Sequence, residues 1–243
     1  GRTGTDVTRE ASDMILTDDD FSTIAAAVRE GRTIYSNVRK FMRYMLSSNL
    51  GEVLVMFLCA LFLLPLPLAP IHILLVNLVT DGLPAMTLGL DRADRDVMRR
   101  LPRKKDEGIF SHGLALKILL RGCVIGAVTV CVFSLTLKNS GDIALSRTAA
   151  FVTLALSQLV FVFECRSERG GMFSRYIFNN TYLNAAVIVS LCVMAVSVYS
   201  AAFSKIFGLV PLPVQTALAC VFAAFASAAV TSALSLISIK RKP

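Results

Sequence analysis

Apolar residues in this chain are gathered into long runs that are separated by short polar segments. Runs of about 20 predominantly apolar residues are typical of helices that cross a bilayer. Six such runs follow one another, at approximately residues 41–64, 71–90, 114–137, 148–163, 183–203 and 213–239. The pattern therefore predicts six transmembrane helices.

The first 40 residues show a different, mixed pattern. Residues 14–16 predict a short strand, residues 17–20 an acidic turn, and the following segment a helix that Asp20 is placed to cap. Neither Gly nor Pro occurs from Arg32 to Leu50, so one helix is expected to run from the cytosol into the membrane.

The expected fold is therefore an all-α polytopic membrane helical bundle that carries a short α/β piece at its N-terminus. We place the boundary between the two parts after residue 31, which gives segments 1–31 and 32–243.

Composition and charge support this interpretation. Hydrophobic residues make up 55% of the chain and charged residues 17%, whereas soluble domains contain roughly 25% charged residues. The net charge is +8, and many basic residues lie in segments 91–108, 165–176 and 240–243. Because basic loops favour the cytosolic side, both termini are expected to be cytosolic. The expected partner is the lipid bilayer, not nucleic acid, and the expected location is the plasma (inner) membrane.

The second apolar run contains an unusual polar stretch, "NLVTDGLPAMTLGLD", from Asn77 to Asp91. On a helix, Asn77, Thr80 and Asp81 approach one face. Gly82 and Pro84 are expected to break the helical hydrogen bonds and to free carbonyl oxygens beside the aspartate. A carboxylate at the bilayer centre costs at least about 2.5–3.5 kcal/mol, so a binding partner must offset this cost.

The first run supplies a matching half. In "SSNLGEV", Asn49 and Glu52 lie three residues apart, and Gly51 permits a close neighbour. Five oxygen-bearing side chains, two of them carboxylates, are then available: Asn49, Glu52, Asn77, Thr80 and Asp81. Hard oxygen ligands suit calcium, manganese or a group of smaller cations better than zinc or copper. The alternative is that these residues only form hydrogen bonds between helices.

These motifs carry a family resemblance. "SSNLGEV" followed by "NLVTDGLPAMTLGLD" resembles the fifth and sixth transmembrane helices of type II calcium-transporting P-type ATPases, of the sarco/endoplasmic-reticulum kind. The upstream segment from "TGTDVTREASDMILTDDD" to "FMRYMLSSN" resembles the end of their phosphorylation domain and the stalk helix that follows. The specific similarity covers about residues 3–110.

The resemblance implies that this chain is the C-terminal portion of an ATP-driven calcium pump, a fragment that lacks the phosphorylated aspartate and the nucleotide-binding domain. Binding of ATP and Mg²⁺ is expected in those missing cytosolic domains. The "TGT" at Thr3–Thr5 is similar to part of the phosphorylation motif, but it lacks the aspartate and is not expected to be catalytic. Proton countertransport is a further expectation, because Glu52 and Asp81 should take up protons when the cation leaves.

The family holds two calcium ions between these helices. The resemblance assigns Asn49, Glu52, Thr80 and Asp81 to the first site, and it assigns Asn77 and Asp81 to the second. The first site also takes a carboxylate from the eighth helix of the family. An ungapped comparison puts Phe163 at that position, with Glu164 next to it and Gln158 nearby. The sequence is therefore compatible with transport of either one or two calcium ions per cycle.

Other functions compete with this hypothesis. A stand-alone cation channel or secondary transporter could use the same oxygen cluster, as could a pump for manganese or for sodium and potassium. A purely structural bundle that supports a partner chain is a third possibility. Gly122 and Gly126 form a GxxxG pattern in the third run, which predicts close packing near Gly51.

Overall fold

The computed structural model describes residues 3–94, 96–103, 107–111, 113–166 and 179–239, with side chains up to residue 233. Several residues discussed above lie outside these ranges: the basic residues of segment 167–178, Lys104 and Lys105, and the tail 240–243.

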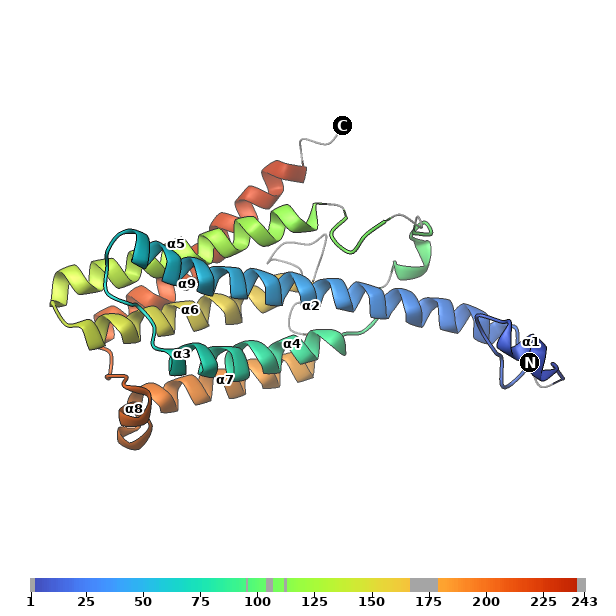
Figure 1. Cartoon of the computed structure of the whole chain (residues 1–243), viewed down its shortest axis with the longest axis horizontal. Helices are drawn as coiled ribbons and strands as arrows, with labels where there is room; N and C mark the ends of the chain where they lie inside the picture. Colours follow the sequence, from blue (N-terminus) through green and yellow to red (C-terminus); the bar gives the residue numbers. More distant parts are fainter. Residues whose placement is uncertain (1–2, 95, 104–106, 112, 167–178, 240–243) are drawn as a thin grey trace.

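Every regular element in the described ranges is helical, and the elements follow one another as a series of long helices with short connections (Figure 1). They are α1 (Asp6–Glu10), α2 (Ser22–Leu61), α3 (Pro70–Leu75), the π-helical segment η1 (Val76–Asp81), α4 (Gly82–Gly89), the 3₁₀ turn η2 (Val97–Arg99), α5 (Leu114–Ser140), α6 (Ile143–Cys165), α7 (Thr181–Tyr199), α8 (Ala201–Phe207) and α9 (Val214–Ile239). Six helices in these ranges are long and apolar enough to cross a membrane, with α3, η1 and α4 counted as one. The prediction of six spans is confirmed.

The expected α/β piece at the N-terminus is wrong for the residues that the structure describes. Residues 14–16 are irregular, and no strand occurs in the described ranges. A strand is stable only when a neighbouring strand pairs with it, and segment 3–21 folds instead into α1 and a turn. In that turn the Thr23 hydroxyl donates to Asp18 at 2.6 Å, and the Ser22 amide donates to Asp20 at 2.8 Å.

Helix α2 is a single rod of 40 residues, about 60 Å long at 1.5 Å per residue. Its first half extends beyond the bundle, and its second half lies among the other spans (Figure 1). The prediction of one uninterrupted helix from Arg32 to Leu50 is therefore confirmed.

Helices α2 and α5 approach each other through glycines. A Cβ atom built on Gly51 would lie 2.9 Å from Cγ2 of Ile125, and one on Gly126 would lie 2.9 Å from Cβ of Leu54. A Cβ atom on Gly122 would lie 2.8 Å from the Leu50 side chain. The predicted close packing of Gly122 and Gly126 against the Gly51 region is confirmed.

Helix α6 is the central span. Its apolar window is 83% buried, whereas that of α7 is 28% buried. It packs against α5, α9 and α2, and it also contacts η1. Any side chain that α6 directs toward α2 or η1 is therefore enclosed by protein.

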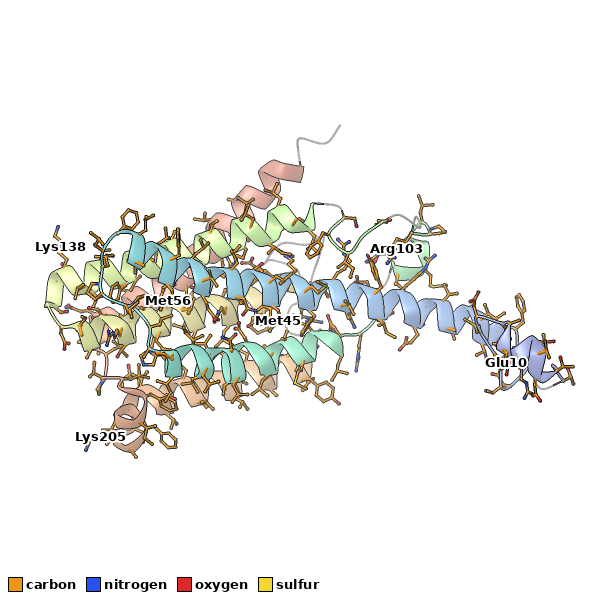
Figure 2. All side chains as sticks on the ribbon, viewed as in Figure 1. Glu10, Met45, Met56, Arg103, Lys138 and Lys205 are labelled. Carbon is orange, nitrogen blue, oxygen red and sulfur yellow. The ribbon has the colours of Figure 1, made fainter. Side chains whose placement is uncertain are left out.

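The bundle has two ends at which the connections between its helices lie. The start of α2, the connection from α4 to α5 and the end of α9 lie at one end, and Lys138 and Lys205 lie at the other (Figures 1 and 2). Arg103, in the α4–α5 connection, lies at the first end (Figure 2). The arrangement agrees with the basic loops sharing one side of the membrane.

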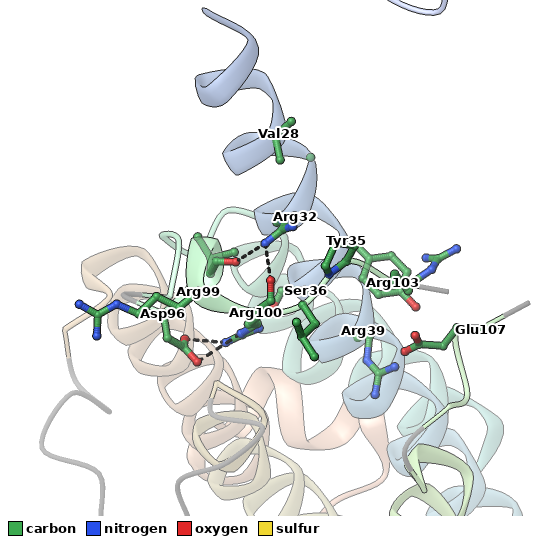
Figure 3. Close-up of a pocket in the computed structure, with 14 residues that line it drawn as sticks. Val28, Arg32, Tyr35, Ser36, Arg39, Asp96, Arg99, Arg100, Arg103 and Glu107 are labelled. Atoms are coloured by element: carbon green, nitrogen blue, oxygen red, sulfur yellow. Dashed lines mark hydrogen bonds and ion pairs between the residues drawn. The ribbon is translucent and has the colours of Figure 1, made fainter. Parts of the chain in front are cut away.

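The outer part of α2 holds the α4–α5 connection by its main chain. Arg32 donates to the carbonyl oxygens of Val97 at 3.0 Å and Arg100 at 2.8 Å, and Arg39 donates to that of Ile109 at 3.1 Å. These arginines line a pocket of about 1000 Å³ between the rod and the connection (Figure 3). Most of these contacts are to carbonyl oxygens, so they hold the main chain of the connection, and Arg39 also donates to the Ser111 hydroxyl at 2.9 Å.

Candidate cation site within the membrane

The site forms where the second span changes from α-helix to π-helix. The amide of Gly82 donates to the carbonyl of Asn77, five residues earlier, which is the π-helical pattern. A Cβ atom on Gly82 would lie 3.1 Å from that carbonyl oxygen, so glycine suits the wide turn. The expectation that Gly82 and Pro84 break the helix is therefore corrected: the chain stays helical through Gly89 and widens at Val76–Asp81.

Pro84 nevertheless changes the hydrogen bonding beside Asp81. Proline has no amide hydrogen to donate. Two nearby carbonyl oxygens accept hydrogen bonds from hydroxyl groups of other helices instead. Tyr44 of α2 donates to the carbonyl of Thr80 at 3.2 Å, and Ser190 of α7 donates to that of Val79 at 2.8 Å.

Asp81 is completely buried at this turn. The Tyr44 hydroxyl is 3.1 Å from its Oδ1, and its Oδ2 has no hydrogen-bond partner among the described residues. Tyr44 has only one hydroxyl hydrogen, and Asp81 and the Thr80 carbonyl both lie within hydrogen-bond distance of it. A buried carboxyl oxygen without a partner is a group that a bound cation or proton would stabilise.

Glu52 is the second buried carboxylate, and it joins three helical segments. Its Oε2 accepts a hydrogen bond of 2.8 Å from Asn77 of η1, and its Oε1 accepts one of 3.0 Å from Gln158 of α6. The two amides hold the Glu52 carboxylate between α2, η1 and α6.

Gln158 contacts a residue of the candidate site, and the ungapped comparison did not identify this contact. That comparison favoured Phe163, which is partly buried against the apolar core, with Glu164 beside it. Glu164 lies instead 3.6 Å from Arg121 in a separate buried ion pair. Gln158 could have been found as the one side-chain amide in α6, because an amide in an apolar span usually has a polar partner.

Of the five predicted ligands, the structure places Glu52 and Asn77 in direct contact. Thr80 and Asp81 are buried on the same π-helical segment as Asn77, and the Thr80 hydroxyl donates to the Val76 carbonyl at 2.8 Å. Asn49 differs, because its side chain is exposed on the surface of α2.

The available donor atoms decide which ions suit this site. Among the described residues, no three His, Cys, Asp or Glu side chains lie close enough together to hold a metal ion between them. The site consists instead of two carboxylates with amide and hydroxyl oxygens, which are ligands of hard cations such as calcium.

Fold and site together define a class of protein: a multi-pass helical membrane protein with a buried, carboxylate-containing polar site between its spans. Residues 65–237 match the family described as "Cation transporting ATPase, C-terminus". The chain belongs to this family of cation-transporting P-type ATPases.

Individual relatives agree with this assignment. The chain is 51% identical over 208 residues to "Calcium-transporting ATPase" of Bacillus subtilis, a match that covers 85% of this chain and 23% of the relative. It is 32% identical over 300 residues to "Calcium-transporting ATPase 2, endoplasmic reticulum-type" of Arabidopsis thaliana, covering 100% of this chain and 28% of the relative. It is 54% identical over 128 residues to "Endoplasmic reticulum calcium ATPase srcA" of Aspergillus fumigatus, covering 53% of this chain and 13% of the relative. The chain thus spans about a quarter of the length of the first two relatives.

Proposed function

We propose that this chain is the C-terminal transport region of an ATP-driven calcium pump, in which Asn49, Glu52, Asn77, Thr80 and Asp81 bind the transported ion. The observation that carries the proposal is the pair of buried carboxylates, Glu52 and Asp81, on neighbouring helices of the bundle. The names of the relatives favour calcium as the ion. Gln158 joins the proposed site through its contact with Glu52.

The exposed side chain of Asn49 fits the same proposal. The chain covers about a quarter of its longer relatives, so further helices of the whole pump are available to cover this face of α2. In the complete site, Asn49 would lie between α2 and that additional part of the protein.

The geometry of α2 supports coupling of transport to ATP hydrolysis. In the whole pump, ATP and Mg²⁺ would act in the cytosolic domains, and residues 1–31 would be the end of the phosphorylation domain. A displacement of that domain would be carried down the rod, which spans about 30 Å from Arg32 to Glu52. Tyr44 lies on the rod between them and reaches Asp81 directly.

The hydrogen bonds around Asp81 favour proton countertransport. Without a cation, an ionised Asp81 and the Thr80 carbonyl compete for the single hydrogen of Tyr44. A protonated Asp81 can donate to the Tyr44 oxygen while Tyr44 donates to the carbonyl, so the two groups no longer compete for one hydrogen. Protons would therefore replace calcium at this position during the return step.

Topology completes the proposal. With the N-terminus in the cytosol, the basic α4–α5 connection and the end of α9 are also cytosolic, as the distribution of basic residues favours. The plasma (inner) membrane is the proposed location.

The test is ATP-driven calcium uptake into inverted membrane vesicles that contain the full-length parent protein. Native protein is compared with Asp81→Asn and with a control, Asp142→Asn. Asp142 is exposed at the start of α6, where it caps the amide of Ala144, and asparagine also caps helices well.

Uptake by native protein and by Asp142→Asn, but not by Asp81→Asn, is the expected result. Uptake that persists in Asp81→Asn would reject the site. Calcium flux without ATP would favour a channel or secondary transporter. ATP-driven uptake of manganese or sodium, but not of calcium, would show that the pump transports a different ion from the one proposed.

A further inference from the structure

Ser190 makes a polar contact between α7 and the cation-binding span. Its side chain is fully buried, and its hydroxyl donates a hydrogen bond of 2.8 Å to the carbonyl oxygen of Val79. Helix α7 contributes no carboxylate to the site, and most of its residues are apolar. The Ser190 hydroxyl is therefore a polar link between α7 and the main chain of η1.

The position of Val79 explains why this link matters. The π-helical bond at this turn runs from the Gly82 amide to the Asn77 carbonyl, five residues earlier. Continued by two residues, the same pattern would require the amide of Pro84 as the donor to the Val79 carbonyl. Proline cannot donate. A hydroxyl group from another helix can take the place of the missing amide and stabilise the wide turn.

We infer that Ser190 is a positioning residue for the cation site: it holds the Val79 carbonyl and so fixes the turn that directs Thr80 and Asp81 inward. The inference deepens the proposed function and rests on it, because it assumes that Asp81 binds the transported ion. Ser190 itself acts through the main chain and is not a ligand.

A second serine on the same helix offers a matched comparison. Ser197 is also buried, but its hydroxyl donates at 2.8 Å to Val193, four residues earlier on α7 itself. Serines in membrane helices commonly bond to their own helix in this way. Ser190 differs because its acceptor belongs to the neighbouring span.

The experiment compares purified full-length pump carrying Ser190→Ala, Ser190→Thr or Ser197→Ala. The first readout is the calcium concentration that half-saturates ATP-driven uptake, measured beside the thermal unfolding temperature. Loss of one net hydrogen bond corresponds to roughly a three- to tenfold effect. Ser190→Ala should therefore need about that much more calcium, while Ser190→Thr and Ser197→Ala should resemble native protein.

If Ser190→Ala does not fold, Ser190→Thr and Ser190→Val can be compared instead, because they differ in the hydroxyl group but hardly in shape. A calcium dependence that is the same for both would overturn the inference. So would an equal loss of thermal stability in Ser190→Ala and Ser197→Ala with no change in calcium dependence.

A second readout separates this inference from the proposed function. Amide hydrogen exchange of the peptide that contains residues 76–84, in the absence of cations, should rise in Ser190→Ala but not in Ser197→Ala. Native protein that transports no calcium would reject the proposed function, and the exchange result would still decide whether Ser190 holds the turn. Unchanged exchange in Ser190→Ala would reject the anchoring role whichever ion is transported.

Discussion

Gln158 of α6 donates a hydrogen bond of 3.0 Å to the Glu52 carboxylate of α2, across 106 positions of the sequence. A neutral amide therefore stands beside a buried carboxylate at the proposed calcium site. The identity of this neighbour controls how much negative charge the empty site must tolerate.

The first prediction follows from replacing this amide with a carboxylate. Gln158→Glu places two carboxyl groups within hydrogen-bond distance, and like charges at that distance cannot both be ionised readily. We expect a lower thermal unfolding temperature without calcium and a larger rise on adding calcium than in native protein. Differential scanning fluorimetry of the detergent-solubilised full-length pump measures both. Equal calcium-induced shifts in the two proteins would contradict the assignment of Gln158 to the site.

The second prediction concerns the close contact of α2 with α5. Gly51→Ala forces a methyl group to within 2.9 Å of Ile125, and overpacking of this kind costs about 1–3 kcal/mol. Gly31→Ala, in the same helix, is the control, because a Cβ atom there meets nothing within 4 Å. Since alanine is the better helix former by roughly 0.5–1 kcal/mol, we expect Gly31→Ala to unfold at a slightly higher temperature and Gly51→Ala at a lower one. The same response from both would mean that the glycine contact does not limit the packing.

The third prediction concerns the buried pair of Arg121 and Glu164. Arg121 lies 3.6 Å from Glu164, donates to the Ser227 carbonyl at 2.7 Å, and stacks over the Phe161 ring at 4.6 Å. Removing one partner of a buried pair costs roughly 3–5 kcal/mol, because the other charge is left alone. Arg121→Met should therefore destabilise the protein strongly.

The double variant Arg121→Met with Glu164→Gln should recover part of that loss, because no lone charge is left behind. Unfolding temperatures of the native protein, both single variants and the double variant form the cycle that tests this. Strictly additive effects would show that the two residues do not interact.

The fourth prediction concerns pH dependence at the N-terminal end of α2. The hydrogen bond from the Thr23 hydroxyl, together with the Asp20 amide, lowers the pKa of Asp18. A lowered pKa in the folded state means that this contact stabilises the folded turn above the ordinary pKa of aspartate and loses that effect as the pH falls through the lowered value. Thr23→Val should return the pKa of Asp18 toward its ordinary value. Carboxyl ¹³C chemical shifts in a pH titration would show this, and an unchanged midpoint would contradict it.

Membrane spans were predictable from the sequence because their existence depends on local composition. The number of spans and the continuity of α2 follow from apolar runs and from the absence of Gly and Pro. The strand at residues 14–16 failed because a strand depends on a partner elsewhere, and its apolar residues alone cannot supply one.

The sequence indicates which polar residues lie within the apolar runs, but it does not indicate their geometry. Gly82 and Pro84 indicate an irregular helix, yet only the structure distinguishes a π-helical turn from an unwound one. Asn49 and Glu52 are about 60° apart around a helix axis, which is enough for one to be buried and the other exposed. Gln158 faces Glu52 because of how α6 packs, and a position-by-position comparison of sequences cannot show that.

The central position of α6 also has a consequence for how the protein is made. Three polar residues in α6 or at its C-terminal end contact earlier helices and loops. Gln158 contacts Glu52, Glu164 contacts Arg121, and Arg166 contacts Asp91. Each of these partners precedes α6 in the chain and has left the ribosome before it. During synthesis, α6 therefore enters a bilayer in which a partner for each of these polar groups is already present. It can pack against the earlier helices before α7 and α9 are made.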